Sequence, residues 1–194
     1  DQDDLAKVLR ETLISTSQPQ NDYFTPILDA EVPPRHHLTL AKYRLLATEW
    51  GVPDTTAVCY PARACFTLKT HAPKAGPCYE KFAYLQGWNF PDEPTKESLV
   101  FWIPRLVPGS TNKTRDEQLQ LLGEIRARFD LPKHHLTSFG QVALNAGLIL
   151  AHFKRTGERA PLDCYWIRTD TCNAGGHRLR LGNFGGVGLG CGYW

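Results

Sequence analysis

Two pairs of adjacent histidines are the residues whose type could most directly do chemistry, because imidazole is the commonest protein ligand of transition metals. Each pair lies in a segment that reads Pro, basic residue, His, His, Leu, Thr, and the pairs are His36–His37 and His134–His135. Adjacent side chains point apart on a helix or a strand, and neither pair is followed at short range by another His or a carboxylate. We therefore interpret both pairs as helix starts and expect no metal or other cofactor, with a metal-assisted enzyme that uses the four imidazoles as the alternative.

The cysteines are the second group with possible chemistry. None of the six has the two-residue spacing of zinc knuckles or thioredoxin-like sites, and none lies in a local context that would lower a thiol pKa. A nucleophilic mechanism would have to pair one of them with His71, His152 or His177 from a distance. We expect reduced, inert thiols and no catalytic residue, so the protein is predicted not to be an enzyme; a disulfide framework is the alternative for the set Cys59, Cys65, Cys78, Cys164, Cys172 and Cys191.

Phosphate and nucleic-acid chemistry are the remaining possibilities. The Gly-rich tail has neither a Lys-Ser/Thr ending nor a following helix, which excludes a Walker or Rossmann loop. The chain has 22 Lys and Arg against 20 Asp and Glu, a net charge of +2, so no phosphate-binding surface is implied for the whole protein. A local basic region with stacking aromatics in the second half keeps a nucleic-acid-binding domain as an alternative, but we favour ordinary solvated charge for Lys154, Arg155, Arg159, Arg168, Arg178 and Arg180, beside Tyr165 and Trp166.

Helical spacing of apolar residues appears in four segments. They are predicted as helices over residues 3–16, 38–50, 116–128 and 138–156. In the second, Leu40, Tyr43, Leu45, Leu46 and Trp50 are expected on one buried side. Thr114 is positioned to cap the third helix, and a Thr-Ser pair to begin the fourth, which is apolar nearly all round and is expected to be central.

Strand patterns separate and follow these helices. Residues 55–70 are rich in Val, Tyr, Phe and Thr and predict a strand, and the Pro- and Gly-containing residues 71–78 predict a loop. Residues 98–107 predict a short buried strand. Beyond Pro161, residues 165–167 and then Leu179, Leu181 and Phe184 alternate with polar or Gly positions, as in short antiparallel strands. The fold class predicted is α+β, with the fourth helix packed on a small antiparallel sheet.

The C-terminal composition is unusual. From Thr169 to Tyr193 the chain contains no Lys, Glu, Gln, Met or Trp, whereas the preceding residues use Lys, Glu and Gln freely. A Gly-rich hairpin region, which needs turn formers more than long charged side chains, accounts for part of this bias.

The same region resembles a known family. Residues 165–171 (YWIRTDT), Gly175-Gly176, residues 178–184 (RLRLGNF) and Gly188-Leu189 resemble the C-terminal part of C-type-lectin-like domains, and most closely bacterial variable proteins of diversity-generating retroelements. In that family, adenines of template Asn codons are randomised, and the resulting codons never encode Lys, Glu, Gln, Met or Trp.

The resemblance implies a ligand-binding protein that presents a diversified C-terminal surface. Scaffold residues would be interleaved with varied ones, and the ligand is expected to be a protein, since many small side chains suit a broad interface. No calcium-site tripeptide of sugar-binding lectins occurs in the C-terminal half, so sugar binding is not implied. The predicted ligand-binding residues are Cys172, Asn173, His177, Asn183, Gly185, Gly186, Val187, Gly190, Cys191 and Tyr193.

Length and patterning set the predicted organisation. We expect a helical N-terminal extension over residues 1–54 and an α+β C-type-lectin-like domain over residues 55–194, truncated at its C-terminus because a closing strand would be expected after Trp194. No apolar run reaches membrane-spanning length, so no membrane span is expected. The chain begins at Asp1 and has no Met, so we expect the natural start to be missing; localisation stays open, with the cytoplasm favoured, and no oligomeric state is predicted.

Overall fold

The structure is a computed structural model that describes residues 23–159, 162 and 164–194. The helix predicted over residues 3–16 and the loop after it lie outside the described residues. The chain divides into two compact units, and the chain passes between them more than once. Of the described residues, the first unit holds 26–60 and 99–138, and the second holds 23–25, 61–98 and the remainder from 139 onward.

The first unit is mainly helical. Its principal helix, α2 (His37–Glu49), confirms the prediction for residues 38–50, and it buries Leu40, Tyr43 and Leu46. The prediction that Leu45 lies on the same buried side is wrong. Leu45 is 63% exposed, because the buried side of the helix continues from Tyr43 to Leu46 and Ala47. The other elements of this unit are η1 (Asp29–Glu31), η2 (Pro34–His36), η3 (Asp54–Thr56), β1 (Val58–Ala62), β2 (Ser98–Trp102) and α4 (Arg115–Arg128), with the end of β1 and the start of β2 passing into the second unit.

The helix α4 begins where the sequence predicts. The Thr114 hydroxyl accepts a hydrogen bond from the Glu117 amide, and the Glu117 carboxylate accepts one from the Thr114 amide at 2.6 Å, a reciprocal capping box. Leu122 and Ile125 are its buried residues. Ile125 packs in the same core as the buried residues of α2, together with Val32, Ala57, Cys59, Phe101, Ile103 and Leu131.

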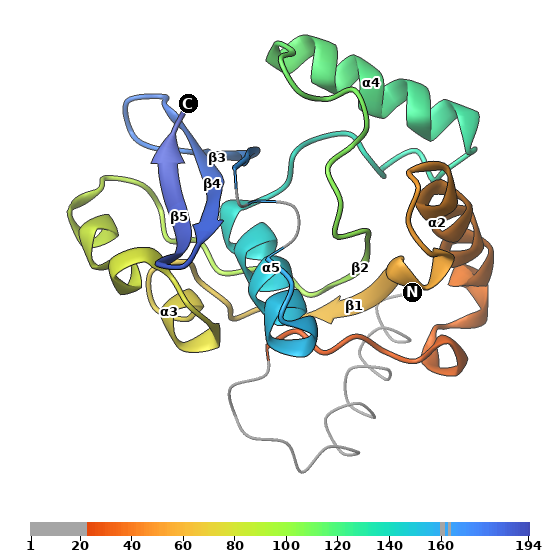
Figure 1. The fold of residues 1–194 in the computed structure, drawn as a ribbon, viewed down its shortest axis with the longest axis horizontal. Helices are drawn as coiled ribbons and strands as arrows, with labels where there is room; N and C mark the ends of the chain where they lie inside the picture. The colour runs from red at the N-terminus through yellow and green to blue at the C-terminus, as the bar shows by residue number, and fades with distance from the viewer. Residues whose placement is uncertain (1–22, 160–161, 163) are drawn as a thin grey trace. The chain divides into compact units, whose positions relative to one another are not determined.

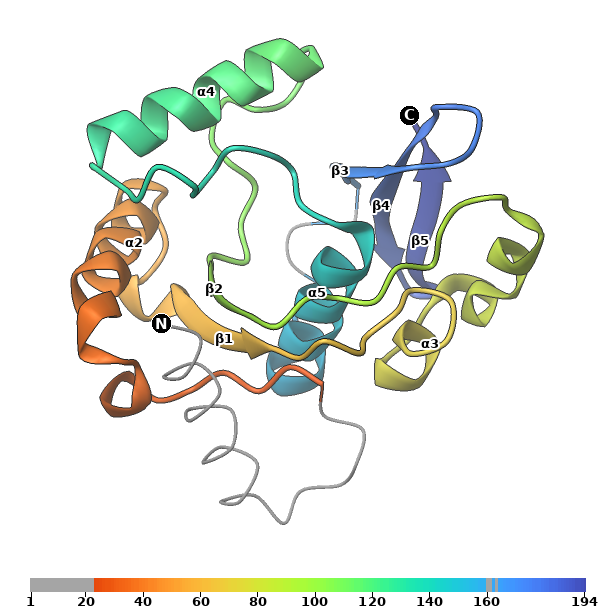
Figure 2. The same cartoon turned by 180° about the vertical axis from the view of Figure 1, so that it is seen from behind.

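The second unit is built on a three-stranded antiparallel sheet. Its strands are β3 (Trp166–Cys172), β4 (Arg178–Gly185) and β5 (Gly188–Tyr193), in that order. The helix α5 (Val142–Thr156) packs against β3 and β4 (Figure 1). The Phe153 and Phe184 rings lie 5.1 Å apart between them. Figure 2 shows this helix and sheet from behind. The predicted α+β class and the helix on a small antiparallel sheet are therefore confirmed.

The start of α5 differs from the prediction. The helix begins at Val142 and not at residue 138, and its N-cap is Gln141. Gly140 has a left-handed backbone with φ of +76°, a conformation that interrupts a helix, and it exchanges hydrogen bonds with Asp170 on β3. A contact with a strand thirty residues away, not the local Thr-Ser pair, decides where the helix starts.

The segment between β1 and the sheet also differs. The strand predicted over residues 55–70 is limited to β1, because the chain beyond it is held by a side chain: the Thr95 hydroxyl donates to the Arg63 carbonyl and accepts from the Phe66 amide. The predicted loop 71–78 contains one helical turn, α3 (Ala72–Ala75).

A further element, η4 (Tyr79–Gly87), follows α3 and lies along β5. Three consecutive residues in it, Glu80, Lys81 and Phe82, have φ between 46° and 57°. This left-handed conformation costs roughly 1–2 kcal/mol for each non-glycine residue. Phe82 and Leu85 are fully buried, and their burial offsets this cost.

Candidate functional site

The turn between β3 and β4 carries several of the predicted binding residues. The Asn173 amide nitrogen donates to the His177 carbonyl, and the His177 amide donates to the Asn173 side-chain oxygen, both at 2.9 Å. Gly176 closes the turn through its hydrogen bond to the Asn173 carbonyl. Asn173 thus fixes the turn, while the exposed His177 side chain is available to a ligand.

Tyr193 extends this end of the sheet with an aromatic surface. Its ring stacks on Trp88 with centroids 4.2 Å apart and planes 18° apart, and the His177 ring lies 6.1 Å from it. The Ala174 amide donates to the Asn89 carbonyl, which ties the turn to the chain that carries Trp88. We call Trp88, Tyr193 and His177 the aromatic end of the sheet.

The sequence analysis missed Trp88. It lies directly after η4, in the stretch of residues 79–97 for which no element was predicted, and its partner Tyr193 is far away in the sequence. The available signal was the density of rings in that stretch, where Tyr79, Phe82 and Tyr84 precede Trp88 within ten residues.

The edge of β5 is closed by Tyr84. Its hydroxyl donates to the Cys191 carbonyl at 3.1 Å and accepts from the Cys191 amide at 3.0 Å. Cys191 is buried, and burial raises the pKa of its thiol to about 12. Gly190 beside it is buried as well. Gly190 and Cys191, which were predicted to bind the ligand, are therefore not accessible at the surface of the sheet.

The second turn, between β4 and β5, carries the other predicted residues. Gly185 pairs with Gly188, so Gly186 and Val187 form a two-residue hairpin turn. Val187 is 66% exposed and Gly186 is exposed. Asn183, which lies near the end of β4 that leads into this turn, is also exposed and has a φ of 48°.

The two turns lie at opposite ends of the sheet. They are joined by the eight residues of β4, which at about 3.3 Å per residue places them roughly 23 Å apart. The predicted binding residues therefore form two groups and not one continuous patch: Cys172, Asn173, His177 and Tyr193 at the aromatic end, and Asn183, Gly185, Gly186 and Val187 at the other.

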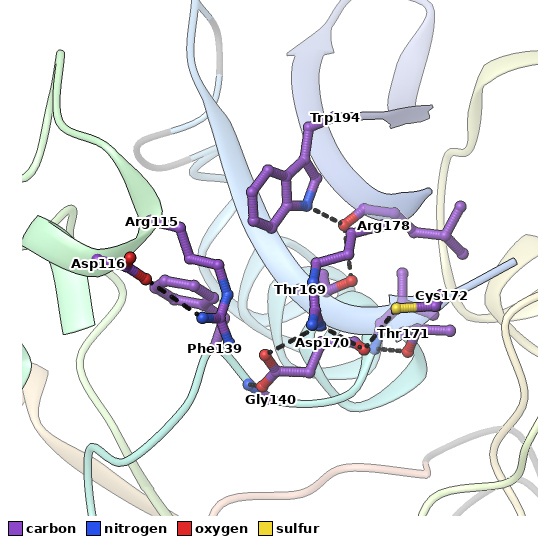
Figure 3. Close-up of polar contacts among 12 residues, drawn as sticks. Arg115, Asp116, Phe139, Gly140, Thr169, Asp170, Thr171, Cys172, Arg178 and Trp194 are labelled. Atoms are coloured by element: carbon purple, nitrogen blue, oxygen red, sulfur yellow. Dashed lines mark hydrogen bonds and ion pairs between the residues drawn. The ribbon is translucent and has the colours of Figure 1, made fainter. Parts of the chain in front are cut away.

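Figure 3 shows the polar contacts of Asp170, which lies on β3 close to the β3–β4 turn. Its side chain accepts a hydrogen bond from the Gly140 amide at 2.9 Å, and its carbonyl accepts one from Arg178 at 3.2 Å and a weak one from the Cys172 thiol at 3.6 Å. The neighbouring Thr171 hydroxyl accepts from the Val142 amide at 3.0 Å, the first turn of α5. The end of β3 that precedes the β3–β4 turn is thus hydrogen-bonded to Gly140 and to the first turn of α5.

Three of the four paired histidines contribute to one aromatic cluster in the first unit. Tyr43 and His135 Nδ1 share a hydrogen bond of 3.1 Å, and both rings lie within 6 Å of Phe101, as does His36. His134 packs edge-on against His135. Burial, with His134 and His36 adding to it, lowers the pKa of His135 to about 4, so its neutral form packs among the rings.

Only one of the two histidine pairs begins a helix, as was predicted for both. His37 shares a hydrogen bond of 2.7 Å with the Val32 carbonyl, and His36 is the N-cap of α2, so the first pair does begin a helix. The second pair does not: it lies in a turn, and the next helix begins only at Val142, because Gly140 interrupts the chain. In the described part of the chain, no three or more His, Cys, Asp or Glu side chains are arranged to hold a metal ion.

Two buried thiols and two of the remaining histidines have structural roles. Burial raises the pKa of Cys59 and of Cys78 to about 12, so both are protonated at neutral pH. His71 Nδ1 accepts from the Thr67 amide at 3.0 Å, and the buried His152 contacts Glu158. None of these hydrogen bonds joins a histidine to a thiol.

The basic residues of the second half do not form a single patch. Lys154 and Arg155 occupy the last turn of α5, where their positive charges interact favourably with the negative end of the helix dipole. Arg159 lies over the Phe153 ring. The other three, Arg168, Arg178 and Arg180, are on β3 and β4.

Compared with known proteins, the chain matches no protein family, no curated protein and no solved structure. In the part of the chain that the structure describes, the helices are too short or too polar to cross a membrane.

Proposed function

We propose that this protein binds a protein ligand through the exposed residues of its C-terminal sheet, in the manner of a C-type-lectin-like variable protein, and that it is not an enzyme. One observation carries the proposal. Within residues 178–191, Leu179, Leu181, Phe184 and Leu189 are fully buried, whereas the two turns are exposed. A sheet of this kind tolerates changes at its turns without changes in its core.

The aromatic end supplies the anchor that such a surface needs. The stacked, half-buried Trp88–Tyr193 pair supplies a rigid aromatic contact at low conformational entropy cost, and the exposed His177 adds an adaptable polar group. The turn Gly186-Val187 at the opposite end forms a separate contact region. The C-type-lectin-like fold is part of this proposal and rests on the sequence resemblance. The predicted domain bounds of 1–54 and 55–194 rest on length and patterning, whereas the two compact units group residues 26–60 with 99–138.

The first experiment compares the coding sequence with its genomic neighbourhood. We expect a near-copy of the 3′ end, with adenines at the codons for Asn173, His177, Asn183 and Tyr193, beside a reverse transcriptase. Sister copies should vary at these codons and keep those for Leu181 and Phe184. Even variation along the whole gene, or the lack of any template in a complete genome, would remove the diversification hypothesis.

A second experiment tests the binding surface directly. Displayed libraries are randomised either at the β3–β4 turn, including Ala174 and His177, or at exposed positions of α4, and both are selected against one purified protein. We expect binders from the turn library, and we expect a Trp88→Ala change to weaken them. Equal yields from the two libraries would show that this turn has no special capacity for recognition.

A further inference from the structure

The sheet has a second face, turned away from α5, with a distinct chemistry. Because side chains alternate along a strand, Leu179 and Leu181 point to the buried side, and Arg178 and Arg180 to the opposite side. Trp166 and Arg168 on β3 join them, since Arg168 pairs with Arg180 in the strand register. The three strands contain three arginines and one aspartate. We call this surface the Arg–Trp face.

Two of its arginines are held on indole rings. The Arg180 guanidinium carbon lies 4.6 Å from the Trp166 ring centroid, and that of Arg168 lies 4.6 Å from the ring of Trp194. Glycines make room for this arrangement: a Cβ at Gly190 would lie 3.3 Å from the Trp166 ring, and one at Gly192 would lie 3.3 Å from Arg180 Nε. The guanidinium forks are thus positioned before any partner arrives.

The Arg–Trp face places two positive charges opposite each other. Arg168 and Arg180 are direct cross-strand partners, and like charges directly opposite each other destabilise a sheet. The aspartate of the face is already engaged, since Asp170 interacts with Arg178 and with Gly140. Among the described residues, the buried Arg180 Nε has no hydrogen-bond partner. A local conflict of this kind is expected at a functional site.

We infer that the Arg–Trp face docks a carboxylate-rich segment of a partner protein. A carboxylate placed between Arg168 and Arg180 would offset their repulsion, and a planar guanidinium fork matches its two oxygens. A base that stacks on Trp166, which is 37% exposed, would have to compete with the Arg180 guanidinium, which already lies over this ring. The charge complementarity therefore favours an acidic peptide over a single-stranded nucleic acid. This surface lies beyond the proposed turn contacts and does not depend on them.

The test is a titration of the full chain at low salt with a fluorescent oligoglutamate peptide, and in parallel with an oligothymidylate of equal charge. The key variant is Arg180→Gln, and its matched control is Arg105→Gln, which removes the same charge from an exposed position of the first unit. We expect about a tenfold weaker peptide affinity for Arg180→Gln, the loss of one charge-assisted hydrogen bond, and little change for Arg105→Gln. Arg180→Lys should lie between them, because lysine keeps the charge and loses the planar fork.

A measurement on the unaltered protein tests the same surface without relying on the folding of a variant. In NMR spectra, the peptide should shift the indole N–H signals of Trp166 and Trp194 and leave those of Trp50 and Trp102 in place. Equal affinities of Arg180→Gln and Arg105→Gln, tighter binding of the oligothymidylate, or no shift at Trp166 would each overturn the inference.

Discussion

Replacement of Gly182 by alanine tests the close approach of β3 and β4 on which the Arg–Trp face depends. A Cβ at Gly182 would lie 2.1 Å from the Tyr165 carbonyl oxygen and 2.7 Å from the Trp166 Cα. Both are main-chain atoms, so no side-chain rotation relieves the overlap. To reach even 3.0 Å, the shortest distance that Cβ atoms normally show, the strands must separate by close to 1 Å locally.

The expected cost follows from this displacement. Overpacking of this kind costs about 1–3 kcal/mol, and movement of the Tyr165 carbonyl also weakens its hydrogen bond with the Asn183 amide, worth about 1 kcal/mol. We expect Gly182→Ala to lower the free energy of unfolding by about 2–4 kcal/mol. For a chain of this size, that corresponds to a decrease in Tm of roughly 10 °C.

The matched control is Gly185→Ala, three residues along the same strand, where a Cβ would meet nothing within 4 Å. It should keep the unfolding midpoint or raise it slightly, since alanine reduces the entropy of the unfolded chain. Both variants are measured by thermal and urea unfolding, with near-UV circular dichroism reporting the packing of Trp166. Equal midpoints for Gly182→Ala and Gly185→Ala would refute the close approach of the two strands.

Three further changes test other contacts. Tyr84→Phe removes the hydroxyl that bonds both main-chain groups at the edge of β5 and should cost about 2 kcal/mol in urea unfolding, whereas Tyr79→Phe, at an exposed ring on the same element, should leave the midpoint unchanged. The folded-state pKa of His135 lies at about 4, below its ordinary 6.5, so its neutral form stabilises the fold above pH 6.5 and this contribution is lost as the pH falls toward 4. His135→Gln should therefore reduce the slope of stability against pH in that window, and an unchanged slope would contradict the assignment. Thr114→Ala should cost about 1 kcal/mol through the lost cap of α4, and Thr111→Ala, at an exposed position just before it, should cost much less.

The elements that the sequence predicts well are those whose bounds are set locally. The helix α4 begins at Arg115, one residue from the predicted start, because Thr114 and Glu117 form the cap within a single turn of chain. The strand β4 likewise follows from the pattern of apolar residues within 178–184. In both cases the residues that decide the structure are neighbours in the sequence.

The features that sequence reasoning misses depend on distant partners. The start of α5 is set by Gly140 with Asp170, and the closure of β5 by Tyr84 with Cys191, which are 107 residues apart. The same holds for the predicted binding surface. The family resemblance predicted these C-terminal residues as one binding surface, but their division between two ends of the sheet, with Cys191 buried, follows only from the register of the strands.

The closed edge of β5 also bears on how the protein meets other chains. Exposed strand edges recruit foreign strands, which leads to sheet extension, domain swapping or aggregation. On β5, two successive amides that point away from β4 are both used within the chain: that of Leu189 by the Pro77 carbonyl, and that of Cys191 by the Tyr84 hydroxyl. A strand from another molecule therefore finds no run of unpaired amides at this edge. Self-association through sheet extension is therefore disfavoured at this edge, and a partner that approaches β5 must be recognised by side chains.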